Sequence, residues 1–206
     1  MRPPALFIGD APALDFLNSI ATPVDVPVEW LDNGEGLLSW LQQAGLVAAP
    51  VLERMRSRSL PGELNKVADQ ARSLREWFRG FVEEHRGRHL RPDDLKKLEP
   101  LNRLLERDEC FSQIGPATGR DGAAFELQRL RRWRSPEALL FPIAETLARF
   151  VCSEDLSHVK ACEGTACTLL FADHTRGQAR RWCSMAICGN RAKQAAHRQR
   201  LKSQRA

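Results

Sequence analysis

The chain has 206 residues, of which 43% are hydrophobic, and it carries a formal net charge of +5 at pH 7. This length and composition suffice to bury a core, and they allow one domain with an appendage or two small domains. No apolar run approaches the roughly eighteen residues of a membrane span, and the opening MRPPALFIGD lacks the apolar stretch of a signal peptide, so we expect a cytoplasmic protein without a membrane partner.

The positive charge lies in the last quarter of the chain. Residues 156–206 contain ten lysines or arginines and two acidic residues, whereas residues 1–155 carry a small negative excess. The polar run Ser153-Glu154-Asp155 marks a boundary at the point where the charge changes. We therefore predict a domain at residues 1–155 and a basic unit at residues 156–206.

The N-terminal domain is predicted to be mostly helical. Apolar residues recur at spacings of three and four through several segments, which is the pattern of amphipathic helices. Pro23 and Pro27 are expected to end the element before them. The next helix is expected to begin at a capping residue, Asp32 or Asn33, and to end at Gly45. The predicted helices are a brief one within residues 5–20, one from Asp32-Asn33 to Gly45, two at residues 50–58 and 63–85, and two that begin near Pro92 and Ser135.

A small β-hairpin is expected to interrupt these helices. Apolar and polar residues alternate through residues 125–133, residues 119–122 are a turn signal, and residues 110–114 supply the other strand. The arginines of the second strand either contact phosphate or form a solvated face offset by neighbouring acids, and the second interpretation is favoured because charge runs are common on surfaces. These arginines are Arg129, Arg131, Arg132 and Arg134.

Four cysteines form two CxxxxC pairs in the C-terminal unit. Cys162 and Cys167 make the first pair, Cys183 and Cys188 make the second, and residues 168–182 lie between them. Four thiols at this spacing suit one tetrahedral Zn²⁺, because each pair can form a short knuckle around the ion. The sequence therefore predicts a structural zinc site.

The segment between the cysteine pairs is predicted to be a second β-hairpin. Leu169 and Phe171 alternate as one strand, residues 180–182 form the other, and residues 173–177 form the turn. After Gly189, the sequence AKQAAHRQRLKSQ contains strong helix formers and neither Gly nor Pro. The fold class expected is mainly α with a small β-hairpin (α+β), a helical N-terminal domain followed by a treble-clef-like zinc finger.

The second knuckle carries a family resemblance. The tetrapeptide Cys188-Gly189-Asn190-Arg191 and the preceding residues 181–185 resemble the CGNR zinc-finger family. The segments LDFLNSI (14–20), GLLSWLQQAGL (36–46) and SLREWFRGF (73–81) are similar, more weakly, to the helical domain that precedes this finger in proteins described as stress-induced transcription regulators. The resemblance implies that the four cysteines are zinc ligands, and His174 departs from the family pattern.

Two cysteines lie outside the pairs, and no catalytic motif is present. Cys110 and Cys152 are expected to be small core residues, because Cys is among the most buried residue types. Disulfides are disfavoured in the reducing compartment expected here. The sequence contains no GxSxG elbow, phosphate-binding glycine loop, HExxH or dinucleotide fingerprint. Four thiolates leave zinc no open position for water, so we do not expect an enzyme.

The leading hypothesis is a DNA-binding transcription regulator whose zinc finger and C-terminal helix contact the nucleic acid. At about 100° per residue, several basic residues fall on one face of that helix, while Lys193 and Arg200 point the opposite way. The predicted nucleic-acid contacts are this stripe, Arg191, Arg198, Lys202 and Arg205, with Arg176, Arg180 and Arg181 from the segment between the knuckles.

Several alternatives remain open on the sequence alone. A zinc-stabilised protein-interaction or RNA-binding module would use the same basic residues, and thiolate oxidation would make the finger a redox switch. Arg191 either contacts nucleic acid or packs on the thiolates, and Asn190 is expected to cap the helix start. The N-terminal domain is free to bind a small-molecule effector or to form a homodimer.

Overall fold

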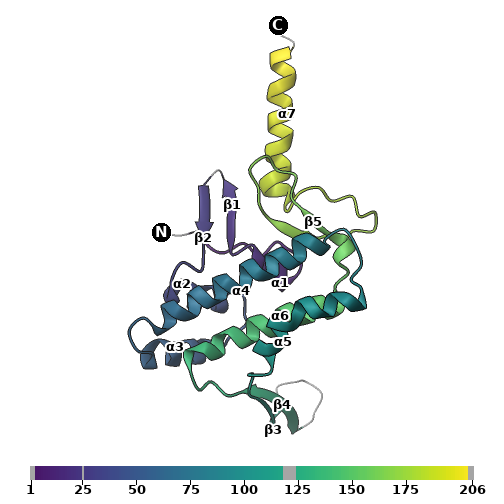
Figure 1. The fold of residues 1–206 in the computed structure, drawn as a ribbon. Helices are drawn as coiled ribbons and strands as arrows, with labels where there is room; N and C mark the ends of the chain where they lie inside the picture. The colour runs from purple at the N-terminus through teal and green to yellow at the C-terminus, as the bar shows by residue number, and fades with distance from the viewer. Residues whose placement is uncertain (1–2, 25, 118–123, 204–206) are drawn as a thin grey trace.

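Helices make up most of the structure (Figure 1). The computed structural model describes residues 3–24, 26–117 and 124–203. In chain order the helices are α1 Pro12–Leu17, α2 Gly34–Gln43, α3 Ala49–Arg58, α4 Glu63–His85, α5 Glu99–Leu105, α6 Leu140–Ser153 and α7 Asn190–Ser203. Among these described residues the strands form antiparallel pairs, β1 Ile20–Val24 with β2 Val26–Glu29, β3 Cys110–Pro116 with β4 Phe125–Arg131, and β5 Val159–Ala161 with β6 Leu170–Ala172. Short helical turns are η1 Pro92–Leu98, η2 Pro136–Leu139, η3 Leu156–His158 and η4 Met185–Gly189.

The helices predicted from apolar spacing are confirmed, as is the α+β fold class. The Asn33 side chain accepts a hydrogen bond from the Gly36 N–H at 2.9 Å and caps α2. Gly45 follows the end of α2 with a φ of 67°, in the left-handed region that favours glycine. Helix α4 keeps its predicted bounds and buries one face, because its apolar residues recur at helical spacing.

Hairpin β1–β2 is present in the structure but is not predicted from the sequence, where Pro23 and Pro27 are taken to break any regular element. Both prolines lie within these strands. Each strand of a two-stranded sheet is an edge strand, where a proline that lacks an N–H can face solvent. The pairing register also shifts between Ala21 and Val24, beside Pro23. The prolines therefore shape the hairpin without preventing it.

Hairpin β3–β4 lies where the sequence predicts it, although its predicted turn at residues 119–122 falls outside the described residues. Arg131 donates hydrogen bonds to both carboxylate oxygens of Asp108, at 2.6 and 2.7 Å, and to Glu145 at 2.8 Å. The other arginines of the string pair with Glu145 or Glu109. Neighbouring acids thus offset this basic face, as the favoured interpretation expects.

One hydrophobic core runs from the helical domain into the C-terminal unit. Helix α4 packs against α1 and α2, and α6 packs against α1 and α5. Strand β6 packs on α1, and its residues 170–172 are all buried. Three of the paired cysteines, Cys162, Cys183 and Cys188, are buried in the same core. Apolar packing therefore joins the finger to the helical domain.

Hydrogen bonds also hold β6 against N-terminal residues. Asn18 directly follows α1 and is almost fully buried. Its side-chain amide donates to the Leu170 carbonyl at 2.8 Å, and its side-chain oxygen accepts from the Leu170 N–H at 2.9 Å. The Ala172 N–H donates to the Gly9 carbonyl at 2.9 Å. These bonds position the strand that follows the first pair of cysteines.

Candidate zinc centre and basic helix

The four cysteines predicted as ligands come together in space. The sulfur atoms of Cys162, Cys167, Cys183 and Cys188 all lie within 4.8 Å of one another. The Sγ atoms of Cys167 and Cys183 are 3.8 Å apart, and those of Cys183 and Cys188 are 3.6 Å apart. Tetrahedral zinc with Zn–S bonds of about 2.3 Å separates its sulfurs by about 3.8 Å. The cluster therefore fits one zinc ion.

The electrostatics of the cluster also favour a cation. The hydrogen bond between the Cys183 and Cys167 thiols lowers the pKa of Cys167 to about 5. The same bond, together with burial, raises the pKa of Cys183. Burial above all raises the pKa of Cys188 to about 12. Because one thiolate opposes the ionisation of its neighbours, a divalent cation is needed to hold four thiolates together.

The first knuckle depends on a glycine and on backbone donors. Cys162 comes directly after β5, and a Cβ atom placed on Gly164 would lie 3.1 Å from the Sγ atom of Cys188. The Cys162 sulfur accepts hydrogen bonds from the Gly164 N–H at 3.4 Å and from the Cys183 N–H at 3.3 Å. Hydrogen bonds from N–H groups stabilise a thiolate, so both knuckles support the Cys162 ligand.

Ser184, and not Asn190, caps the helical end of the finger. The Ser184 hydroxyl accepts from the Ile187 N–H at 3.4 Å at the start of η4, a π-helical turn that continues into α7. Asn190 already has helical angles, with a φ of −66° and a ψ of −37°. A Cβ atom on Gly189 would lie 2.6 Å from the sulfur of Met185, so glycine lets this turn close. The capping role predicted for Asn190 is therefore wrong, because the helical path begins one turn earlier.

The hairpin predicted between the knuckles is also wrong. Strand β6 pairs with β5, which precedes the first knuckle, and not with residues 180–182. The Arg180 guanidinium lies 4.3 Å from the centre of the Phe171 ring. It also donates to the Trp182 carbonyl at 2.9 Å and to the Cys183 carbonyl. These contacts turn Arg180 inward, and residues 180–182 form no strand in the structure.

Arg180 also connects the finger to the start of the chain. Its guanidinium pairs with the Asp10 carboxylate and donates to the Ile8 carbonyl at 3.4 Å. Its side chain is 24% exposed. The partners of the Arg180 guanidinium among the described residues thus belong to this protein's own fold.

Asp173 organises the loop that follows β6, although it is not among the site residues predicted from the sequence. One carboxylate oxygen accepts from the Thr175 N–H and hydroxyl, at 3.1 and 2.6 Å. The other accepts from the Arg180 N–H at 2.9 Å and from the Lys160 ammonium at 2.7 Å. Burial disfavours the charge, but these donors hold the pKa of Asp173 well below its ordinary value. The Asp-x-Thr pattern, typical of an Asx turn, is the signal that identifies it.

We expect Asp173→Ala to lower the free energy of unfolding by about 3 kcal/mol at pH 7, because it leaves buried donors without an acceptor. The lowered pKa means that the carboxylate contributes stability above an ordinary pKa of about 4 and loses it as the pH falls further. Denaturant unfolding of the zinc-loaded protein measures the effect. Asp93→Ala, at an exposed position, should change stability by less than about 0.5 kcal/mol. Equal effects of the two changes would contradict this role for Asp173.

The basic residues of α7 whose exposure the structure describes, from Arg191 to Arg200, are exposed. Arg191 and Arg198 are exposed, and they line one side of a groove of about 250 Å³ between α7 and the first knuckle. Arg191 makes no hydrogen bond or ion pair with another described residue. Lys202 lies on α7, whereas Arg205 lies outside the described residues.

The remaining predicted contacts come from the segment between the knuckles. Arg176 is exposed. Arg181 is also exposed, and its guanidinium pairs with the Glu163 carboxylate at 2.6 Å. His174 bonds to Glu154 at 2.8 Å and is not part of the sulfur cluster.

The prediction that both unpaired cysteines are core residues is wrong. Cys152 is exposed because it lies near the end of α6, outside the face that α6 buries. Cys110 is only partly buried, and its thiol donates to Asp108 at 3.2 Å. Neither cysteine belongs to the cluster.

The fold and the cluster define a zinc-finger protein in which a helical domain carries a tetrathiolate site and a basic helix. Residues 10–154 match the family described as "Putative stress-induced transcription regulator", and residues 158–201 match the CGNR zinc finger. The first match covers more than half of the chain, and the chain belongs to that family. Neither family is an enzyme family. Comparison with curated proteins gives no match. Among the described helices, none has both the length and the hydrophobicity that crossing a membrane requires.

Proposed function

We propose that this protein is a DNA-binding transcription regulator in which zinc holds the base of α7 and α7 contacts the DNA backbone. The observation that carries the proposal is α7 itself, which extends away from the body of the molecule (Figure 1). It has 14 residues and no acidic residue, and the residues of known exposure are almost all exposed. Isolated helices of this length are marginally stable in water, so a helix of this kind calls for a partner outside the chain. Its charge suits a polyanion.

The arrangement of charges on α7 supports the proposal. Arg191 and Arg198 share the side of the helix that faces the first knuckle. Ala192 and Ala195 lie beside them, and their small side chains permit close approach to a phosphate backbone. Helical geometry places Lys193 on the opposite side. The helix therefore has one face suited to a groove wall and one suited to solvent.

We propose a contact set that differs from the sequence prediction at one position. It comprises Arg191, Arg198, Lys202 and Arg205 of the stripe, with Arg176 and Arg181 from the segment between the knuckles, and it leaves out Arg180 because its guanidinium is engaged within the protein. The ion pair of Arg181 with Glu163 is exposed at both side chains. Such pairs contribute little, so a phosphate can replace Glu163. The reducing cytoplasm is the compartment we propose, because free thiolates persist there to bind zinc.

The test is the salt dependence of binding by the zinc-loaded protein. Selection from a random DNA pool supplies the duplex, and fluorescence anisotropy gives the affinity. If about four to six phosphates are contacted, the logarithm of affinity should fall with log salt at a slope near −4 to −5. Arg198→Ala should reduce that slope by about one.

Lys193→Ala is the matched control, because Lys193 lies on the same helix but on the opposite face. It should change the slope distinctly less than Arg198→Ala. Equal losses from both faces would contradict a fixed orientation of α7 on DNA. Salt-sensitive binding of single-stranded RNA in preference to the duplex would favour the RNA-binding alternative, and no salt-sensitive binding at all would favour protein interaction.

A further inference from the structure

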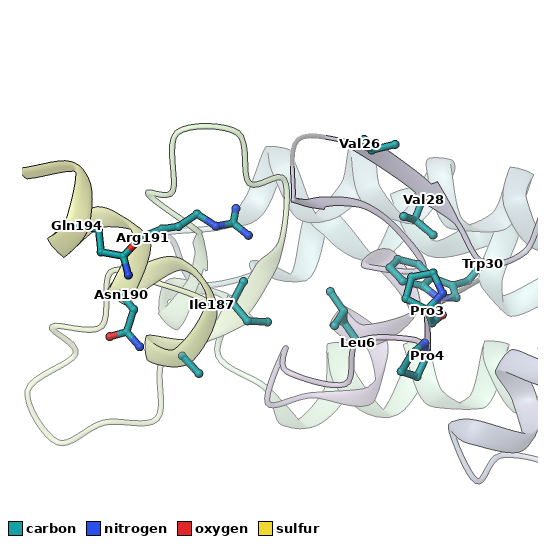
Figure 2. Close-up of a pocket in the computed structure, with 11 residues that line it drawn as sticks. Pro3, Pro4, Leu6, Val26, Val28, Trp30, Ile187, Asn190, Arg191 and Gln194 are labelled. Atoms are coloured by element: carbon teal, nitrogen blue, oxygen red, sulfur yellow. Dashed lines mark hydrogen bonds between the residues drawn. The ribbon is translucent and has the colours of Figure 1, made fainter. Parts of the chain in front are cut away.

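A groove of about 520 Å³ lies between the base of α7 and the N-terminal part of the chain (Figure 2). One wall comes from the segment before α1 and from β2 with the residue that follows it. The other comes from the end of the second knuckle and the first turns of α7. Pockets that bind small molecules measure about 300 to 1,000 Å³ and favour interfaces between domains. The groove is therefore large enough for a small ligand, and it lies where the helical domain meets the finger.

The walls of the groove are mostly apolar. The segment before α1 supplies Pro3, Pro4 and Leu6, and β2 supplies Val28. Val26 also lines the groove and is 65% exposed, so apolar surface faces solvent there. Burying such surface under a hydrocarbon group is favourable.

A hydrogen bond keeps one wall in place. The Trp30 indole N–H donates to the Pro3 carbonyl at 2.9 Å, which ties the segment before α1 to the residue after β2. Trp30 is itself buried and packs in the core. The apolar wall is thus part of the folded helical domain.

The opposite wall carries one cation. Of the described residues that line the groove, Arg191 is the only one with a charged side chain. Asn190 and Gln194 lie beside it on α7 and offer amide groups. Figure 2 shows the Arg191 side chain extending from α7 toward the side where Val26 and Val28 lie. Because Arg191 has no carboxylate partner among the described residues, its charge is complementary to an anionic ligand.

We propose that this groove binds a small amphipathic carboxylate, with its hydrocarbon part against the apolar wall and its carboxylate on the Arg191 guanidinium. The guanidinium fork matches a carboxylate with two hydrogen bonds. Such a ligand would contact both the helical domain and the start of α7. These two parts of the chain belong to the two different family matches. Because Arg191 also belongs to the proposed DNA-contact set, a bound carboxylate takes it away from phosphate, and this last consequence rests on the proposed function.

Octanoate, octanol and octylamine test the ligand class, because they share a tail and differ in the head group. Calorimetric titration into zinc-loaded protein, with no DNA present, should show octanoate binding at least about tenfold more tightly than the other two. Arg191→Gln should weaken octanoate binding at least about tenfold and leave octanol binding unchanged. Arg198→Gln is the matched control, since Arg198 lies on α7 outside this groove, and it should leave octanoate binding unchanged.

A change in the helical domain keeps the test independent of the zinc site. Val28→Glu places a competing carboxylate in the apolar wall and should abolish octanoate binding while zinc content and circular dichroism stay those of the wild type. If Arg191→Gln loses zinc, Val28→Glu decides the question. Equal affinity for the three probes, or full octanoate binding by Val28→Glu, would overturn the proposal.

The consequence for DNA is measured separately. Octanoate should weaken the DNA affinity of the wild type and should not change that of Val28→Glu. If octanoate binds but leaves DNA affinity unchanged, the link to DNA is overturned while the ligand site stands. If the protein binds no DNA, the proposed function fails while the titration still decides the ligand site.

Discussion

Replacing Cys183 with alanine should abolish tight zinc binding and lower the stability of the whole chain. The free energy of structural zinc binding is about 10 kcal/mol or more, and it is folding free energy because the unfolded chain has no preformed site. Cys183 is 1% exposed and belongs to the core that also contains α1 and β6. Two separate domains, divided at residue 155 as the sequence predicts, would let the finger melt while the N-terminal helices survive. The shared core leads us to expect that their melting temperature falls as well.

Metal analysis and circular dichroism of the purified variant measure both parts of this expectation. Cys152→Ala is the control, because Cys152 is exposed and outside the cluster, and it should keep zinc and stability. Full zinc retention by Cys183→Ala would contradict the ligand assignment. Zinc loss with an unchanged Tm of the remaining helices would instead show two independent units, divided near residue 155.

Asn18→Leu should cost about 4 kcal/mol of unfolding free energy, the second-largest effect we expect. The leucine side chain has a similar volume but leaves the Leu170 N–H and carbonyl without partners, and each buried unpaired group costs about 1 to 3 kcal/mol. Asn18 is 1% exposed, so water cannot easily replace the lost bonds. Strand β6 begins shortly after Cys167 of the first knuckle. Displacing β6 should therefore also displace this ligand and weaken zinc retention.

Denaturant unfolding of zinc-loaded protein measures the loss, and competition with a chelator measures zinc retention. Asn102→Leu is the matched control, since Asn102 is exposed on α5 and should shift stability by less than about 0.5 kcal/mol. A loss below about 1 kcal/mol for Asn18→Leu would mean that apolar packing alone positions β6.

The sequence predicts those features that depend on neighbours along the chain. Helix α4 follows from apolar residues at spacings of three and four, and the cap of α2 follows from Asn33. The cysteine spacing predicts the cluster, because each knuckle is a local turn and only two knuckles have to meet. The family resemblance is also confirmed. It can be recognised from the sequence because its motifs are short and contiguous.

Only the tertiary structure decides features whose partners are distant in sequence. Asn18 and Leu170 are separated by 152 positions, and nothing local to either residue indicates that they bond. Arg180 is a basic residue of the kind that contacts DNA. Its guanidinium instead contacts Asp10 and Phe171, because the burial of β6 brings these two residues close to Arg180. The partner of β6 and the groove beside Arg191 likewise arise where separate segments meet. Periodicity and spacing determine local elements, whereas contacts between them depend on how the whole chain packs.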